Sequence, residues 1–155
     1  MGLDMYLRKK IYVGNKYRDN EERIKIKVPK KQKSAMIKIE GIKEERVSSI
    51  EEEIGYWRKT NSIHQWFVDN VQDGNDDCKS YYVSKDKLKE LLCLVKRVLE
   101  NHKLAEKLLP NQEGFFFGST EYDGYYFKDL EETKKIISNA IEDARLGEIY
   151  YDSSW

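Results

Sequence analysis

The spacing of apolar residues changes along this chain, and that change limits the folds that it can adopt. Near the start, Leu3, Met5 and Leu7 alternate with polar residues, which is the period of a half-buried β-strand. Beyond residue 47, apolar residues recur every three or four positions, as in an amphipathic helix. Strands that precede most of the helices predict an α+β fold. We therefore expect three main helices packed with a small antiparallel sheet and a basic β-hairpin.

The basic hairpin is predicted from two further alternating runs, residues 23–28 and residues 36–40. Residues 11–45 are interpreted as a hairpin insertion within a single domain that spans residues 1–155. Six of the eleven residues from Arg23 to Lys33 are positively charged. Such a ribbon could enter a nucleic-acid groove. No aromatic residues stand between these lysines, which favours a solvated face over base stacking and makes nucleic acid the less favoured partner.

Three helices are expected after the hairpin. The first covers residues 47–71, the second begins at a Ser84 cap, and the third is opened by a capping pair, Asp129 and Glu132. Two short strands are also expected, at residues 115–118 and, at the edge of the sheet, at residues 149–151. The first helix carries a stripe spaced by three or four residues: Val47, Ile50, Ile54, Trp57, Asn61, His64, Val68 and Val71.

Composition limits both the cellular compartment and the kinds of chemical site that are expected in this protein. The chain has 155 residues, two Cys and two His, so neither a disulfide framework nor a multi-histidine metal centre is expected. No cofactor motif is present in the sequence. No apolar run approaches the roughly 20 residues that span a bilayer. These features predict a soluble, cytoplasmic protein without a membrane partner.

Two polar residues, Asn61 and His64, interrupt the apolar stripe of the first predicted helix. An unpaired polar group in a core costs roughly 1–3 kcal/mol, so both residues need partners. One interpretation is a hydrogen-bond network that fixes helix packing. The other is a ligand pocket in the middle of the helix, where indole rings form walls and cations bind an anion. The neighbours that would complete this pocket are Trp57, Arg58, Lys59 and Trp66.

A second candidate is the segment that follows Gly118. It crowds hydroxyl, carboxylate and aromatic groups into one loop, as recognition loops do. The alternative is a turn at residues 123–124 whose tyrosines cover the core. The candidate ligand-binding residues in this loop are Ser119, Thr120, Glu121, Tyr122 and Asp123.

Three segments of the chain resemble a family of small uncharacterised proteins encoded by bacteriophages, prophages and bacteria. They are MGLDMYL at residues 1–7, YWRKTNSIHQWF at residues 56–67 and GFFFGSTEYD at residues 114–123. The resemblance covers residues 1–8 and about 50–140. It implies a small accessory protein of phage type. Proteins of this kind often counter host defence, including by sequestering nucleotide signals.

These observations lead to three hypotheses about function. The first is a non-enzymatic binder of a small anionic or nucleotide-like ligand, in which Arg58 and Lys59 bind phosphate and no cofactor takes part. The second is an enzyme that acts on a nucleotide or another phosphorylated substrate, with His64 as acid or base beside Glu121 or Asp123. The third is an inhibitor or adaptor that binds a host protein. The sequence does not constrain the oligomeric state.

Overall fold

The structure is a computed structural model, and it describes residues 2–12, 46–114 and 117–155. The hairpin expected within residues 11–45 lies almost entirely outside the described residues. Contacts divide the chain into two compact units, of which one comprises Met1–Lys10 with Glu51–Trp155 and the other Ile11–Ile50. The described residues of the second unit include residues 11–12 at the end of strand β1 and residues 49–50 at the start of strand β2. The rest of the sheet belongs to the first unit, together with the helices of the described residues.

A four-stranded antiparallel sheet forms one layer of this first unit. Its strand order is β2 (Ser49–Arg58), β1 (Asp4–Tyr12), β4 (Glu148–Ser154) and β3 (Tyr81–Val83). β1 and β4 are antiparallel, with Asp4 opposite Ser154 and Lys10 opposite Glu148. The strand expected at residues 149–151 is confirmed as part of β4, but its expected place at the edge of the sheet is wrong, because β4 pairs with β1 on one side and β3 on the other. The short strand β3 was not expected from the sequence.

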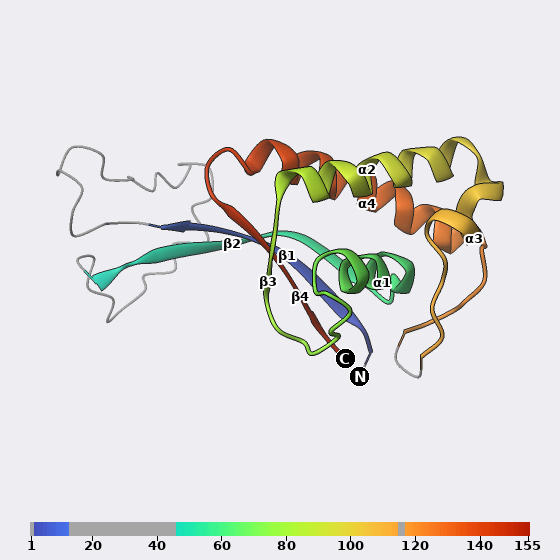
Figure 1. The fold of residues 1–155 in the computed structure, drawn as a ribbon, viewed down its shortest axis with the longest axis horizontal. Coiled ribbons are helices and arrows are strands. Elements are labelled where there is room, and N and C mark those ends of the chain that lie inside the picture. The colour runs from blue at the N-terminus through green and yellow to red at the C-terminus, as the bar shows by residue number, and fades with distance from the viewer. Residues whose placement is uncertain (1, 13–45, 115–116) are drawn as a thin grey trace, which may run out of the picture. The chain divides into compact units, whose positions relative to one another are not determined.

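The helices are α1 (Asn61–Asn70), α2 (Lys85–Glu100), α3 (Ala105–Leu108) and α4 (Gly124–Asp143). Together with the sheet they confirm the α+β class. Helices α2 and α4 lie side by side (Figure 1). Gly55 of β2 lets α4 approach the sheet, because a Cβ at that position would clash with the side chain of Ile136. Within the described ranges, no helix is both long enough and apolar enough to cross a membrane.

The prediction of one helix over residues 47–71 is wrong in its first half. Residues 49–58 form β2, and the helix begins only at Asn61. Spacing by three or four residues fits a helix, but pairing with β1 and ion pairs to its side chains favour the strand. Arg8 lies 3.6 Å from Glu51 and Lys9 lies 2.6 Å from Glu52, so two glutamates that suit a helix start instead bind a neighbouring strand.

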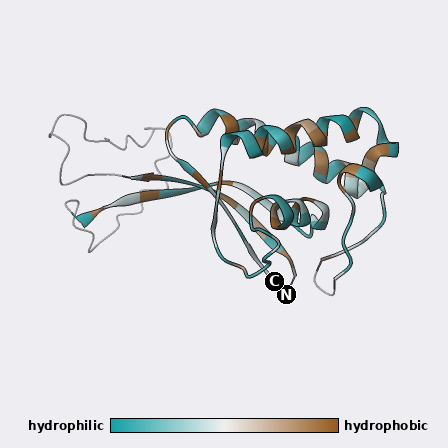
Figure 2. Ribbon diagram, in the orientation of Figure 1, coloured by the Kyte–Doolittle hydropathy of each residue, from teal (hydrophilic) through white to brown (hydrophobic). Residues whose placement is uncertain are grey.

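The core lies between the sheet and the helices. The side chains that alternate on the inner face of β1 are fully buried, and so are those on the apolar faces of α2 and α4. Figure 2 shows hydrophobic residues recurring among hydrophilic ones along both helices. Each Val, Leu, Ile or Met side chain among them contributes about 1.5–3 kcal/mol by leaving water. These residues are Leu3, Met5 and Leu7 of β1, Leu88, Leu91, Val95 and Val98 of α2, and Leu130, Ile137 and Ala140 of α4.

The cap predicted for α2 agrees with the structure, whereas the cap predicted for α4 does not. The Ser84 cap of α2 is confirmed, since its side chain accepts a hydrogen bond from the Lys87 backbone N–H at 3.2 Å. The predicted capping pair of Asp129 and Glu132 is wrong, because both residues lie inside α4. Asp123 is the cap instead, and its Oδ1 accepts bonds from the backbone of residues 125 and 126 at 2.9 and 3.1 Å.

The strand expected at residues 115–118 is not seen in its described half. Phe117 lies in a turn, where its backbone N–H donates to the Gly114 carbonyl at 3.1 Å, and Gly118 belongs to no strand. Residues 115–116 lie outside the described residues. The segment between α3 and α4 is therefore held by side-chain bonds rather than by a sheet ladder, and it forms one wall of the candidate site.

Candidate functional site

A cavity of about 150 Å³ lies where the end of β2 and the start of α1 meet the segment before α4. It joins the two regions that the sequence singles out, residues 58–62 and residues 118–126. We name it the Lys59–Asp129 cavity. Most of its lining residues have polar side chains, although apolar atoms contribute the larger part of the lining surface. The lining comprises Arg58, Lys59, Thr60, Asn61, Ser62, Asn111, Gly118, Ser119, Glu121, Asp123, Tyr125, Tyr126 and Asp129.

Two backbone positions bring these walls together. Lys59 has a φ of 59°, a left-handed conformation that few residues other than glycine adopt and that costs about 1–3 kcal/mol. Its backbone N–H donates to the Leu3 carbonyl at 2.8 Å, which ties the bend to β1. Opposite it, Gly118 has a φ of 93°, and a Cβ there would lie 3.1 Å from the Lys59 Cβ. The sharp bend and the missing side chain together allow the close approach.

The cations of the cavity are Arg58 and Lys59. Both side chains are exposed, and neither has an ion-pair partner among the residues that the structure describes. Lys9 of β1 differs in this respect, because it is bound by both Glu52 and Asp143. Other exposed cations, such as Lys107, also have no ion-pair partner among the described residues, so what distinguishes Arg58 and Lys59 is their place in the lining. Two cations without carboxylate partners beside a cavity are free to bind an anionic group.

Asp129 is the carboxylate that is set deepest in the lining. It is half-buried, and burial raises its pKa above the ordinary value, while a hydrogen bond from Thr60 opposes the rise. The Thr60 hydroxyl donates to Asp129 Oδ2 at 3.1 Å, and Thr60 itself is buried. No hydrogen bond to Oδ1 is found within the described part of the chain. The carboxylate is therefore held by one oxygen, and its other oxygen is open to a donor.

Asn61 connects the parts of the cavity wall. It is 2% exposed, and its Nδ2 donates to the carbonyls of Phe117 at 3.1 Å and Ser119 at 2.9 Å. Its Oδ1 accepts the backbone N–H of Gln112 at 2.9 Å. All three bonds join the start of α1 to the segment between α3 and α4. Asn61 thus lines the cavity, but its polar atoms serve the wall itself.

His64 lies away from the cavity and is fully buried. Its Nδ1 is 2.7 Å from the hydroxyl of Tyr151, and its Nε2 is 3.0 Å from Oδ2 of Asp76. The other oxygen of Asp76 accepts the indole N–H of Trp155 at 3.1 Å. Of the two interpretations of His64, the geometry matches the hydrogen-bond network that fixes packing. His64 has no access to a ligand in the cavity.

The two tryptophans of the predicted pocket are also core residues. Trp57 is 3% exposed and donates its indole N–H to the Thr133 hydroxyl of α4 at 2.9 Å, and Trp66 is 6% exposed. Neither lines the cavity, so the proposed indole walls are corrected: the helix expected around Trp57 is a strand whose inner face points into the core.

The loop after Gly118 divides into residues that line the cavity and residues that do not. Ser119, Glu121 and Asp123 line it, whereas Thr120 is exposed outside it. Tyr122 supports the loop from outside the lining, because its hydroxyl accepts the backbone N–H of Asn111 at 3.1 Å. The other interpretation of this loop, a turn whose tyrosines cover the core, fits Tyr126, which is buried and donates its hydroxyl to the Leu109 carbonyl at 2.8 Å.

The residues that the sequence pattern does not assign to the site are mainly Asn111, Tyr125 and Asp129. The pattern predicts a helix cap at Asp129, so its place in the cavity is missed. One signal could have revealed it: Asp129 stands three residues after Tyr126 and four before Thr133, so it interrupts the apolar stripe of α4 with a carboxylate. Tyr125 is 79% exposed at the rim.

Neither a search for groups of metal ligands nor comparison with known proteins assigns a role to this site. Within residues 2–12, 46–114 and 117–155, no three His, Cys, Asp or Glu side chains are grouped so that they could hold a metal ion. Comparison of the chain with protein-family models, with curated proteins and with solved structures finds no match. The interpretation of the site therefore depends on its geometry.

Proposed function

We propose that this protein is a non-enzymatic binder of a small ligand that carries an anionic group, held in the Lys59–Asp129 cavity. The observation that carries the proposal is the pair of cations without ion-pair partners among the described residues, Arg58 and Lys59, in the lining of that cavity. The strained backbone of Lys59 supports it, because strain of this kind persists where the surroundings enforce it and gathers at ligand sites.

The size of the cavity limits what it can enclose. Its volume of about 150 Å³ is below the roughly 300–1,000 Å³ of pockets that surround drug-sized ligands. One phosphate-sized or sugar-sized group would fit, and the rest of a nucleotide would extend over the rim. Tyr125, 79% exposed there, offers an aromatic face to such an extension.

The resemblance to small phage and bacterial proteins extends this proposal to a biological role. The protein would be an accessory protein of phage type that sequesters a host signal in the host cytoplasm. A ligand held without turnover suits that role, because sequestration requires only affinity and sufficient protein.

Isothermal titration calorimetry of the full chain at low ionic strength tests the binding function, with inorganic phosphate, pyrophosphate and adenosine monophosphate as probes. Lys59→Gly is the informative variant, because glycine accepts a φ of 59° without strain and the fold is expected to survive. We expect it to weaken binding about tenfold or more, as the loss of a charge-assisted hydrogen bond does. Added salt should weaken the wild-type interaction.

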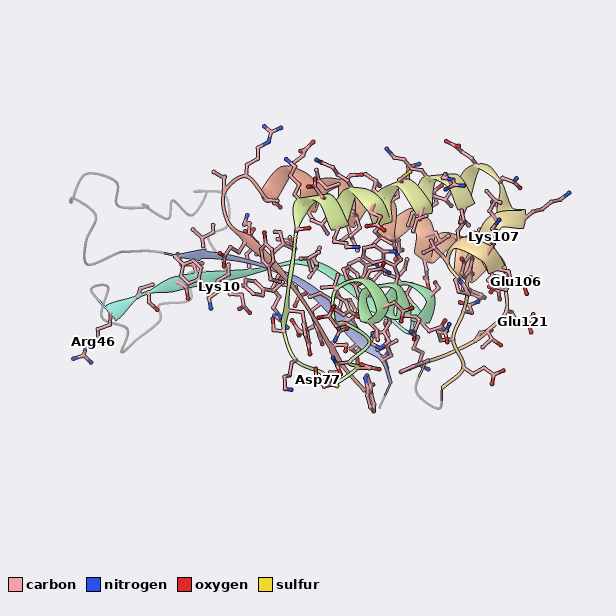
Figure 3. All side chains as sticks on the ribbon, viewed as in Figure 1. Lys10, Arg46, Asp77, Glu106, Lys107 and Glu121 are labelled. Carbon is pink, nitrogen blue, oxygen red and sulfur yellow. The ribbon has the colours of Figure 1, made fainter. Side chains whose placement is uncertain are left out.

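The matched control is Lys107→Ala on α3, an exposed lysine outside the lining that Figure 3 labels. It should bind like the wild-type protein. Failure of all three probes to bind the wild-type protein would refute the proposal. Equal losses in Lys59→Gly and Lys107→Ala would refute the cavity as the site, because the effect would then come from net charge alone.

A second candidate function is binding of a host protein through the rim. The exposure of Tyr125 favours it, because exposed tyrosines are enriched at protein interfaces. Tyr125→Ala would then abolish capture of a purified host partner while leaving calorimetric phosphate binding unchanged.

A further inference from the structure

The charges of the Lys59–Asp129 cavity narrow the class of its ligand. The lining holds two cations, Arg58 and Lys59, but three carboxylates, Glu121, Asp123 and Asp129. A ligand made only of negative oxygens, such as pyrophosphate, would bind the cations and be repelled by the carboxylates. A ligand that fits the whole lining must also present hydrogen-bond donors.

The open carboxylate oxygens show where those donors would bind. Asp129 has one oxygen bound by Thr60 and the other without a hydrogen-bond partner among the described residues. Asp123 uses Oδ1 to cap α4, and no bond to its Oδ2 is found in the part of the chain that the structure describes. Both carboxylates are held in place by their bonded oxygen, so each presents a fixed acceptor. Fixed carboxylate acceptors suit hydroxyl groups, which each donate one hydrogen bond.

Hydroxyl groups fit this lining better than an ammonium group does. A ligand ammonium beside Asp129 would lie in the same cavity as Arg58 and Lys59, and repulsion from these two cations would offset part of its attraction to the carboxylates. A hydroxyl carries no charge and has no such penalty.

We infer that the ligand of the Lys59–Asp129 cavity is a phosphorylated sugar, with its phosphate at Arg58 and Lys59 and its hydroxyls on Asp129 and Asp123. This inference rests on the proposed function and names the ligand class for the same site. The cavity volume of about 150 Å³ suits one sugar ring better than a complete nucleotide. The ring of Tyr125 at the rim would cover the apolar face of the sugar.

The test compares ribose 5-phosphate, inorganic phosphate, ribose and glycine by calorimetry on the full chain. We expect ribose 5-phosphate to bind about tenfold or more tightly than inorganic phosphate, because hydrogen bonds to charged acceptors are strong. Asp129→Asn should remove that preference. It should tighten the binding of inorganic phosphate, since a negative charge is lost from the lining.

Asparagine keeps the shape of Asp129 and an oxygen for the Thr60 hydroxyl, so the variant is expected to fold. Glu106→Gln on α3, an exposed position outside the lining, is the matched carboxylate-to-amide control and should retain the preference (Figure 3). Tyr125→Ala gives a second measurement at an exposed position and should weaken ribose 5-phosphate more than inorganic phosphate.

The outcomes separate this inference from the proposed function. Equal affinity for ribose 5-phosphate and inorganic phosphate, both weakened by Lys59→Gly, would overturn the inference and keep the proposed function. Tighter binding of glycine than of the sugar phosphate would overturn it in favour of a zwitterion. Binding of none of these probes would overturn both.

Discussion

Replacement of Asn61 by alanine tests whether the segment between α3 and α4 is held by one side chain. The substitution removes three hydrogen bonds to the backbone, two donated to the carbonyls of Phe117 and Ser119 and one accepted from Gln112. A typical intramolecular hydrogen bond contributes about 0.5–1.5 kcal/mol net. Since Asn61 is 2% exposed, water cannot readily replace the lost partners. We expect the free energy of unfolding to fall by about 3 kcal/mol.

Urea denaturation followed by circular dichroism measures this loss. The midpoint should fall while the slope stays constant, because the surface exposed on unfolding hardly changes. In a chain of 155 residues a loss of that size corresponds to a fall in melting temperature of about 6–12 °C. Asn61→Asp should lose at least as much, because a carboxylate offers no donor to the two carbonyls.

Asn70→Ala is the matched control on the same helix. Asn70 donates one hydrogen bond, to the Trp66 carbonyl at 2.8 Å, so the expected loss is below about 1 kcal/mol. Hydrogen exchange should show faster opening of residues 111–121 in Asn61→Ala than in Asn70→Ala. The reasoning is refuted if Asn61→Ala loses less than about 1 kcal/mol or no more than this control.

Three further predictions concern stability and pH. His64→Ala should lower the free energy of unfolding in urea by about 2–4 kcal/mol, because it leaves a cavity and removes the hydrogen-bond partner of the Tyr151 hydroxyl. Its affinity for phosphate should persist. A loss of affinity without a loss of stability would contradict the structure. Ser84→Ala should cost about 1 kcal/mol through the lost cap of α2, and an unchanged urea midpoint would speak against that cap. Burial raises the pKa of Asp129, so its ionised carboxyl destabilises the fold at neutral pH, and this cost disappears as the pH falls through the folded pKa. Asp129→Asn should therefore be more stable than the wild-type protein at neutral pH, with an advantage that vanishes below the pKa of a free carboxyl; an advantage that persists in acid would exclude titration of Asp129 as its cause.

The local spacing of apolar residues was sufficient to predict the elements in which buried residues recur every two to four positions. Alternation predicted β1, and spacing by three or four predicted the apolar faces of α2 and α4. Ser84 was identified as a cap because its partner, Lys87, lies three residues away. These features depend on neighbours in sequence, so the residues themselves contain the information.

The interior of the site depended on partners that are distant in sequence. His64 binds Tyr151, 87 residues away, and Asn61 binds Ser119, 58 residues away. An unpaired polar residue in an apolar stripe shows that a partner is needed, but not which one or whether it is a ligand. The tertiary structure provides protein partners for both residues and places Asp129 at the cavity instead.

The strand β2 shows that local sequence does not always decide secondary structure either. Residues 49–58 have an apolar spacing that a helix and a strand both accommodate, and their local sequence favours the helix. Pairing with β1 decides the outcome, because ladder hydrogen bonds and the ion pairs of Arg8 and Lys9 form only when segments more than 40 residues apart meet. The left-handed bend at Lys59 then separates strand from helix, and with Gly118 opposite it this bend creates the cavity. Periodicity thus determined which faces are buried, whereas contacts between distant segments determined where the chain turns and where a ligand could bind.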